Sequence, residues 1–480
     1  MSIVALLEKL VEEISLAEER FFENPKNFYD LENTVKTSAE SFSAGYLGSV
    51  LSDMNDRLCK DGLRKEKYTI ARRDQRTLIT SVGDVVFNST YFRSRQKDGG
   101  YHYLLEEMIG LDARERFSEA AETMILTEAM KTSYEEATKV IPSRSEITKT
   151  TVMNKVHGIA DAIPYEIPQE KKKCEYLFIE ADEDHVAEQH GRWYKENGSF
   201  ISRLAYVYEY KRDIPNIRGR KELVNTFYFG GLYEGSNGVK RFWKSIDKYI
   251  DDHYETEELK RVFISGDGAG WIKNGTSYVG NSLYCVDKYH MTKYINAAAN
   301  QMLEEADSVK EDLYRFIYKK KRKAFKELTD RMAVSAAKPD KVRELQAYAL
   351  GNWEAVMRTY HSKLLTGCSA EGHVSNVLSD RLSSRPMGWS QTGADRMSKL
   401  RCYERNYGRG KIIELVRYSR EQRKLKRTGT EDVEIKKINM KEIIYDHYDQ
   451  SRSYIDRIQA TIPGRTVKKQ IAIRLNLWQM

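Results

Sequence analysis

The chain has 480 residues, with 79 Lys or Arg against 71 Asp or Glu, a formal net charge of +8 and a pI near 8.9. This length exceeds what one hydrophobic core usually organises, so several domains are expected. Aromatic residues make up 11% of the chain, which excludes a disordered polyelectrolyte. The basic balance favours a polyanionic partner without establishing one.

Cysteine usage and the N-terminus indicate the compartment. Five cysteines lie far apart and form no C-x-x-C pair, which argues against a zinc finger and against a disulfide framework. Residues 1–22 interleave apolar residues with acids at helical spacing, as an amphipathic helix does and a signal peptide does not. No apolar run reaches the roughly 18 residues of a membrane span. We expect a cytoplasmic protein without membrane contact.

The first third of the chain predicts helices around one hairpin. Residues 1–70 have helical periodicity, and residues 76–95 form two β-rich runs around Gly83 and Asp84. Helical spacing then returns, so residues 71–163 are interpreted as a β-hairpin followed by a DNA-binding region of helix-turn-helix type.

Residues 133–160 carry the helix-turn-helix pattern, with a turn at Pro142 and Ser143. In the second predicted helix, Thr150 and Asn154, with His157, lie on the face opposite to an apolar stripe. That stripe consists of Val152, Val156, Ile159 and Ala160. A recognition helix presents polar side chains to the major groove in this way. Any helical hairpin with one wet face fits the pattern equally well.

A Pro- and Lys-rich segment, residues 164–173, is interpreted as a linker, after which strands and helices alternate. The expected strands are 175–182, a partner around 186–197, 200–213, 262–267 and 282–287. The expected helices are 240–261, a brief one in 268–275, a long helical stretch over 289–365, and 368–386.

This order of elements predicts a ribonuclease-H-like α/β catalytic domain over 174–288 and 366–400. A helical insertion over 289–365 splits the domain, the mainly helical N-terminal region with its small β-hairpin precedes it, and a basic region over 401–480 follows it. In that plan the first and fourth strands are parallel neighbours, and ligand sites lie beyond the carboxyl ends of such strands.

Three acids fall where this plan needs them. Asp182 ends the first strand, Asp267 ends the fourth, and Glu371 lies near the start of the final helix. Clustered carboxylates repel one another unless cations separate them, and hard oxygen ligands suit Mg²⁺ or Mn²⁺. Each acid also has a plainer interpretation, because Asp before Gly is common in turns and Glu is common in a first helical turn.

Four stretches are long and unusual: "FIEADEDHVAEQHG", "ISGDGAGWIKNG", "CVDKYH" and "GCSAEGHVSNVLSDRLSSRPMGWS". They are similar to the ISLre-type insertion-sequence transposases, a bacterial family akin to the Mutator-like transposases. The resemblance runs over most of the chain and is strongest from about 174 to 400. It implies a DDE transposase that cleaves DNA and transfers strands with two Mg²⁺ or Mn²⁺ ions.

Carried onto this chain, the resemblance makes Asp182, Asp267 and Glu371 the catalytic, metal-binding triad. It adds Asp287 and His290 from a D-x-x-H signature as accessory residues, and Asp184 is an accessory candidate beside the triad. A hydrogen-bonded structural pair, or a contact to DNA, is favoured over metal ligation for His290. The implied partners are double-stranded transposon ends and target DNA, bound by a homo-oligomer at the bacterial nucleoid.

Two basic segments favour the same partner, because cations that neutralise phosphates bind DNA of any sequence. Residues 318–326 include Lys319, Lys320, Lys321 and Arg322, and residues 417–427 include Arg423 and Lys424. Solvated helix faces that bind nothing can show the same runs of Lys and Arg. Two rival functions remain: a nuclease of the same fold that cuts without joining, and a transposase-derived DNA-binding protein that has lost catalysis.

Overall fold

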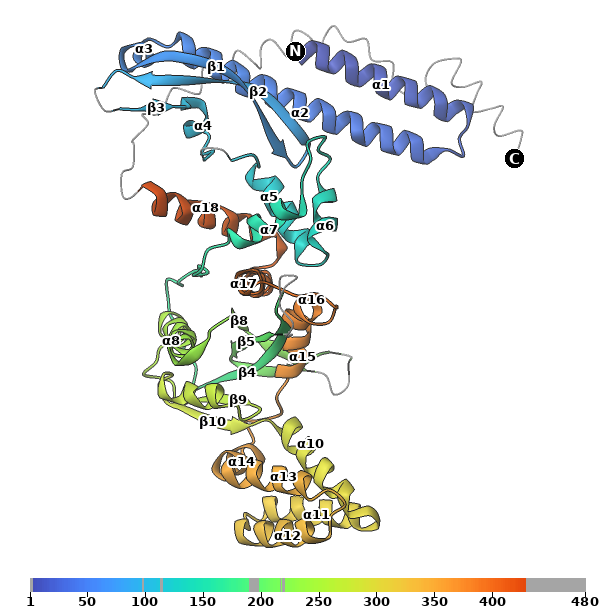
Figure 1. Ribbon diagram of the computed structural model, residues 1–480, viewed down its shortest axis with the longest axis vertical. Coiled ribbons are helices and arrows are strands. Elements are labelled where there is room, and N and C mark those ends of the chain that lie inside the picture. Colours follow the sequence, from blue (N-terminus) through green and yellow to red (C-terminus); the bar gives the residue numbers. More distant parts are fainter. Residues whose placement is uncertain are drawn as a thin grey trace. The chain divides into compact units, whose positions relative to one another are not determined.

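The computed structural model describes residues 3–96, 99–112, 115–189, 198–215, 217 and 221–428. Its contacts divide the chain into two compact units (Figure 1). Unit 1 comprises 1–158 together with 416–480, and unit 2 comprises 159–415. The predicted basic region therefore lies outside the described residues from 429 onwards. No helix within the described ranges is long and apolar enough to cross a membrane.

Unit 1 combines a long helical pair with a three-stranded antiparallel sheet in the order β1-β2-β3. Its strands are β1 (Tyr68–Thr80), β2 (Gly83–Ser94) and β3 (Tyr101–His102). Its helices are α1 (Ile3–Glu23), α2 (Phe28–Lys60), α3 (Gly62–Lys67), α4 (Leu104–Met108), α5 (Glu119–Ala129), α6 (Tyr134–Ala137), the 3₁₀ turn η1 (Thr138–Val140), α7 (Lys149–His157) and most of α18 (Ile412–Thr428).

Helix α2 lies directly on the hairpin. A Cβ atom at Gly48 would stand 2.3 Å from the carbonyl oxygen of Val86, so a side chain there is incompatible with the observed approach. Nearby, the backbone N–H of Thr90 donates to Asn55 Oδ1 at 2.8 Å, and both residues are buried. The predicted hairpin is confirmed, and its first strand begins eight residues earlier than the sequence indicated, at Tyr68 rather than 76.

The predicted helix-turn-helix is only partly matched. In α7, Val152 and Val156 are buried while Thr150 and Asn154 are exposed, which confirms the two faces. The helix ends at His157, however, so the predicted stripe does not continue into Ile159 and Ala160. The element before it is the single turn α6 followed by η1, and a loop over residues 141–148 replaces the expected tight turn.

Unit 2 is built on a five-stranded mixed sheet in the order β10-β9-β4-β5-β8. Strand β9 runs parallel to both β4 and β10, whereas β5 runs antiparallel to both β4 and β8. The strands are β4 (Tyr176–Ala187), β5 (Ser199–Tyr208), β8 (Phe227–Gly231), β9 (Arg261–Gly266) and β10 (Ser282–Val286), with a separate hairpin of β6 (Tyr210–Asp213) and β7 (Lys221–Val224). The predicted parallel neighbours, β4 and β9, are confirmed.

Helices cover both faces of this sheet (Figure 1). On one face α8 (Gly235–His253) contributes Phe242 and Trp243 to the same buried cluster as Leu177 and Ile179 of β4. On the other face α15 (Ala370–Val374) lies over β4 and continues through a π-helical turn, Ser375–Ser379, into α16 (Asp380–Leu382). Helix α17 (Gln391–Tyr407) packs on β8 and β5, so the sheet's helical cover extends past the predicted boundary at 400.

The long stretch after β10 is helical, as predicted, and shares the core of the sheet. Ile295, Leu313, Phe325 and Leu345 belong to the same buried cluster as Leu177. The helices are α10 (Lys288–Ala299), η3 (Asn300–Glu305), α11 (Ala306–Tyr318), α12 (Arg322–Ser335), α13 (Pro339–Gly351) and α14 (Trp353–His361). The brief helix α9 (Gly270–Lys273), followed by η2 (Asn274–Ser277), precedes β10.

Two strand predictions were wrong, and a third lies mostly outside the described residues. Strand β4 runs on to Ala187, so Asp182 lies within the strand, and the segment 186–187 belongs to β4 rather than to a partner. The rest of the expected partner, 190–197, lies outside the described residues. The third strand of the sheet is β8, a short run ending in two glycines that the sequence did not reveal. Helix α8 also ends at His253, well before 261.

Candidate active site

Two of the predicted acids are neighbours on adjacent parallel strands. The register of β4 and β9 pairs Glu180 with Ser265, the last pair before β9 ends. Continuing that register by two residues sets Asp182 opposite Asp267. Paired residues of adjacent strands share a face, so both carboxylates project to the side covered by α15. Asp182 therefore stands where parallel pairing stops, although its own strand continues.

A third aspartate extends this row. The register of β9 and β10 pairs Gly266 with Val286, and the N–H of Asp287 donates to the Gly266 carbonyl at 3.0 Å. Continuing that register by one residue sets Asp267 opposite Asp287. The carboxyl ends of three parallel strands thus present one aspartate each, which we call the aspartate row: Asp182, Asp267 and Asp287.

The row is electrostatically strained at Asp182. Burial, together with the charge of Asp267, raises the pKa of Asp182 to about 6, although the N–H of Glu183 donates to its Oδ1 at 2.9 Å. Asp267 accepts from the N–H of Ala269 at 2.8 Å. Desolvation and repulsion destabilise the charged form of a carboxyl group, and a nearby cation stabilises that form. His290 supplies part of that charge, since its interaction with Asp182 lowers the pKa of Asp182.

Asp287 and His290 form the structural pair that the sequence favoured. Asp287 caps α10, accepting from the N–H of Tyr289 at 2.9 Å, and its other oxygen lies 3.0 Å from His290 Nδ1. This hydrogen bond, with the charges of Asp287, Asp267 and Asp182, raises the pKa of His290 above its usual value. Asp287 is 5% exposed, so its two oxygens are committed to the fold.

The acids on either side of Asp182 hold the helical segment above it. Glu180, 1% exposed, accepts from the Ser369 N–H at 2.6 Å and from the Ser369 hydroxyl at 2.9 Å. Tyr206 and Tyr208 also donate to it, and Lys211 pairs with it at 2.7 Å. Although burial alone opposes its charge, these contacts lower the pKa of Glu180.

Asp184 holds the far end of the same segment. Its Oδ1 accepts from the Ser383 hydroxyl at 2.8 Å, and Ser379 bonds to it as well. Burial raises the pKa of Asp184. Neither Glu180 nor Asp184 is solvated, and each anchors one end of the segment 369–383. The sequence offered little signal for this arrangement, because Ser369 lies 189 residues beyond Glu180.

Glu371 lies on this clamped segment, in the first turn of α15, and is exposed. His373, two positions on, packs over the β5–β8 half of the same sheet face: its ring lies 4.4 Å from that of Tyr206, and its Nδ1 is 2.9 Å from the Tyr228 hydroxyl. Residues two apart on an α-helix point about 200° apart. The Glu371 side chain is therefore directed away from these contacts with β5 and β8.

The predicted triad is only partly assembled. Asp182 and Asp267 are brought together, and Glu371 is on the helix above them. Within the described ranges, no three His, Cys, Asp or Glu side chains are close enough to hold a metal ion together. The three-residue metal site therefore stays a prediction.

The predicted DNA-binding residues lie at several places. The turn between α11 and α12 is exposed and consists of Lys319, Lys320 and Lys321. Arg322 is the first residue of α12. Lys424 is exposed on α18. Arg423, on the same helix, is used within unit 1.

Arg423 donates to the Gly158 carbonyl at 2.9 Å and lies 3.6 Å from Glu122. These contacts account for Arg423 without DNA. Trp271 and Trp389 are buried: Trp271 donates to Glu183 at 2.5 Å, and Trp389 donates to the Leu382 carbonyl at 3.1 Å.

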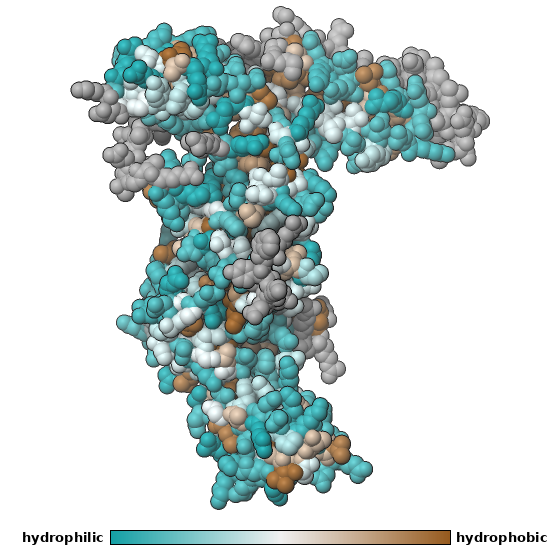
Figure 2. Space-filling view, in the orientation of Figure 1, coloured by the Kyte–Doolittle hydropathy of each residue, from teal (hydrophilic) through white to brown (hydrophobic). Residues whose placement is uncertain are grey.

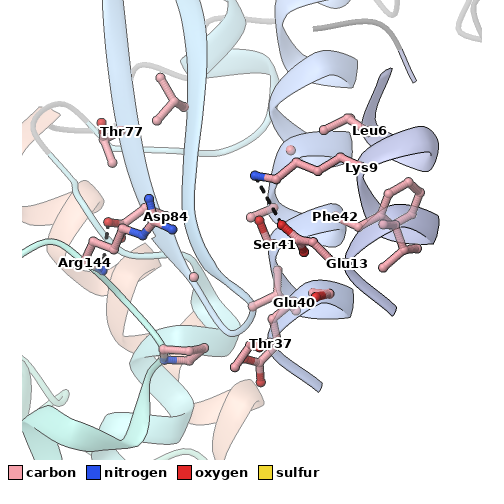
Figure 3. Close-up of a pocket in the computed structure, with 18 of the residues that line it drawn as sticks. Leu6, Lys9, Glu13, Thr37, Glu40, Ser41, Phe42, Thr77, Asp84 and Arg144 are labelled. Atoms are coloured by element: carbon pink, nitrogen blue, oxygen red, sulfur yellow. Dashed lines mark hydrogen bonds and ion pairs between the residues drawn. The ribbon is translucent and has the colours of Figure 1, made fainter. Parts of the chain in front are cut away.

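A hollow of about 600 Å³ in unit 1 holds none of the predicted catalytic acids (Figure 3). Its polar groups are largely paired with one another. Lys9 lies 3.7 Å from Glu13, and Asp84 accepts from the N–H groups of Arg144 and Ser145 at 3.1 and 2.9 Å. Asp84 thereby fixes the loop that precedes α7, which is a structural role.

The fold and the aspartate row define a mixed α/β protein with clustered carboxylates at the carboxyl edge of a parallel strand trio. The chain belongs to the uncharacterised protein family UPF0236, whose family description matches residues 22–420.

Relatives of known sequence lie in bacteria. A UPF0236 protein of Caldanaerobacter subterraneus subsp. tengcongensis is 32% identical over 382 residues, covering 80% of this chain and 79% of the relative. A second, from the same organism, is 32% identical over 391 residues, and its name joins eleven locus designations of that genome. A UPF0236 protein of Streptococcus gallolyticus is 24% identical over 407 residues, covering 81% of this chain and 85% of the relative. The many paralogues in one bacterium are consistent with a family associated with mobile elements.

Among solved structures, the Drosophila P element transposase strand transfer complex matches with 12% identity and a TM-score of 0.22. The match covers 66% of this chain and 94% of that chain. A superposition of this quality carries no weight in assigning the fold.

Proposed function

We propose that this chain is a DDE-type DNA transposase, which cleaves DNA at the ends of an insertion sequence and joins those ends to target DNA. The observation that carries the proposal is the juxtaposition of Asp182 and Asp267 on adjacent parallel strands. Burial and the neighbouring charge of Asp267 raise the pKa of Asp182 to about 6, so holding the two carboxylates side by side destabilises the fold. Such a destabilising arrangement of charged groups is typical of a functional site.

The strand plan supports a ribonuclease-H-like catalytic domain. From β8 to β10 the sheet is ordered third, second, first, fourth and fifth, counting its strands along the chain. The first, fourth and fifth are parallel to one another and the second is antiparallel. Ligand sites in open α/β sheets occur outside the carboxyl ends of parallel strands, where the aspartate row lies.

The donor set suits a hard divalent cation. Asp182 and Asp267 offer carboxylate oxygens, and a cation between them would relieve the repulsion that raises the pKa of Asp182. These two residues would hold Mg²⁺ or Mn²⁺, and Glu371 would add a third carboxylate from α15. When bound, such ions stabilise the attacking and leaving oxygens of a phosphoryl displacement.

The remaining groups of the site act as supports. His290 is held by Asp287, and its charge favours the ionised form of Asp182. Glu180 and Asp184 fix the two ends of the segment that carries Glu371. The exposed turn at Lys319–Lys321 would meet the phosphates of double-stranded ends or target, on which a multimer of this chain would assemble.

The test is a strand-transfer reaction with DNA that carries the sequences flanking this gene. The wild-type chain should form joined product with Mg²⁺ or Mn²⁺ and none with a chelator. Cleavage without joining would instead establish a nuclease. Binding without either reaction, under all metal conditions, would contradict the proposal and favour a transposase-derived DNA-binding protein.

A further inference from the structure

One face of the unit 1 sheet alternates tyrosine and arginine across three strands. The registers pair Arg72 with Tyr91 and pair Arg93 with Tyr101. Tyr103, two residues beyond Tyr101, falls on the same face by alternation. All five side chains thus share the end of the sheet remote from the hairpin turn. We call this set the tyrosine–arginine face.

Its rings form a stack with an open end. The Tyr91 and Tyr101 rings lie 5.1 Å apart with planes inclined by 12°, and the Tyr103 ring lies 4.6 Å from that of Tyr91. The Arg72 guanidinium lies 4.7 Å from the centre of the Tyr91 ring. Among the rings that the structure describes, Tyr101 ends the stack, and it is 52% exposed, so a flat group can lie against its exposed side.

The opposite face of the same strands is closed. Phe92 is 0% exposed beneath the guanidinium of Arg64, and Thr90 is held by Asn55 and Cys59 of α2. Tyr91, Tyr101 and Tyr103 therefore take no part in these contacts of the sheet with α2 and α3. Figure 2 shows mainly hydrophilic colouring over these strands, as an aqueous surface requires.

Charge selects the partner. Residues 60–96 contain nine Lys or Arg and four Asp or Glu, a net charge of +5. Arg72 is paired with Asp74 at 2.8 Å, but Arg93 and Arg95 are exposed and have no ion pair with any residue that the structure describes. Flat rings beside unpaired cations fit a ligand that combines planar groups with negative charge.

We propose that the tyrosine–arginine face binds single-stranded nucleic acid, with a base stacked on Tyr101 and the backbone phosphates near Arg93. Sheet faces that carry aromatic side chains bind unpaired bases in this way, because every base has a π-face and stacking needs no groove. A duplex keeps its bases stacked on each other, so it can offer this face its phosphates alone. The inference does not rest on the catalytic acids, since binding is measured without cleavage.

The test measures binding of the full chain by fluorescence anisotropy, using a labelled mixed-sequence DNA strand of about 20 nucleotides, long enough for several contacts. The matching blunt duplex and an RNA strand of the same sequence separate the possible sources of the strand. The variants are Tyr101→Ala, Tyr101→Phe and Arg93→Gln. Tyr210→Ala is the matched control, since Tyr210 is also on a strand and is 50% exposed, but in unit 2.

Tyr101→Ala should weaken single-strand binding about tenfold, in line with the loss of one stacked base, and barely change duplex binding. Tyr101→Phe should restore binding and Tyr210→Ala should leave it unchanged, while Arg93→Gln should weaken binding and reduce its salt dependence. Equal binding by wild type and Tyr101→Ala would overturn the proposal. So would an equal loss for strand and duplex that Phe fails to rescue.

Discussion

Replacing Glu180 with Gln should destabilise unit 2 by about 3–5 kcal/mol, the usual cost of removing one partner of a buried ion pair. Glu180 is 1% exposed and its partner Lys211 has a side chain that is 12% exposed, so water replaces little of the lost interaction. The Gln amide also replaces one acceptor oxygen by an N–H₂ group, which faces the groups that donate to the carboxylate. Ser369, Tyr206 and Tyr208 all donate to the carboxylate, so at least one would lose its acceptor.

Unfolding by urea at neutral pH, followed by tryptophan fluorescence, measures this cost. The described tryptophans, Trp243, Trp271, Trp353 and Trp389, all belong to unit 2, so their signal reports on it. Glu175→Gln is the control, because Glu175 pairs with Lys260 at the surface and its loss should be undetectable. Equal urea midpoints for Glu180→Gln and Glu175→Gln would refute the stabilising role of Glu180.

The pH dependence of this difference has a definite sign. Contacts with Lys211 and the hydroxyl donors lower the pKa of Glu180 against the effect of burial, so the folded chain binds this proton more weakly than the unfolded chain. The stabilisation by Glu180 is therefore fully present above its unfolded pKa of about 4.3 and is lost as pH falls through the lower folded pKa. The difference in unfolding free energy between wild type and Glu180→Gln should shrink in that acid range. A difference that grows there would contradict a lowered pKa of Glu180 in the folded chain.

Two further predictions concern unit 1. Gly48→Ala should loosen α2 from the hairpin, since the new Cβ would meet the Val86 carbonyl at 2.3 Å, and overpacking of this kind costs about 1–3 kcal/mol. Circular dichroism should show a lower melting temperature than for Gly62→Ala, where the space is open, and equal melting would contradict the clash. Glu122→Gln should cost about 3–5 kcal/mol, because its 1% exposed carboxylate holds Arg420. Hydrogen exchange should speed up in α5, and unchanged exchange would count against a buried pair.

The placement of Asp182 beside Asp267 could be predicted from sequence, because it depends on the order of strands and helices rather than on detailed packing. Parallel β4 and β9 follow from that order, and each aspartate is near the carboxyl end of a strand's parallel pairing. Local patterning also gave the two faces of α7, since Val152 and Val156 repeat at helical spacing.

Other features depend on distant partners that leave no local trace. The β4 strand runs through its acids because β5 pairs with it as far as Ala187, which outweighs the poor strand propensity of Asp and Glu. Strand β8 was missed because its five residues end in two glycines, which weaken any strand pattern. Nothing in the local sequence distinguishes Glu180 from the acids around it, and only its contact with Ser369 shows that it supports α15.

The central claim is that Asp182 and Asp267 together carry DNA cleavage. The most direct test is single-turnover cleavage of duplex DNA bearing the element ends, in Mn²⁺, by wild type, Asp182→Asn, Asp267→Asn and Glu175→Gln. Wild type and Glu175→Gln should cleave the DNA. Neither Asn variant should cleave above the chelator background, while all four proteins should still bind DNA. Cleavage by Asp182→Asn at the wild-type rate would contradict the central claim.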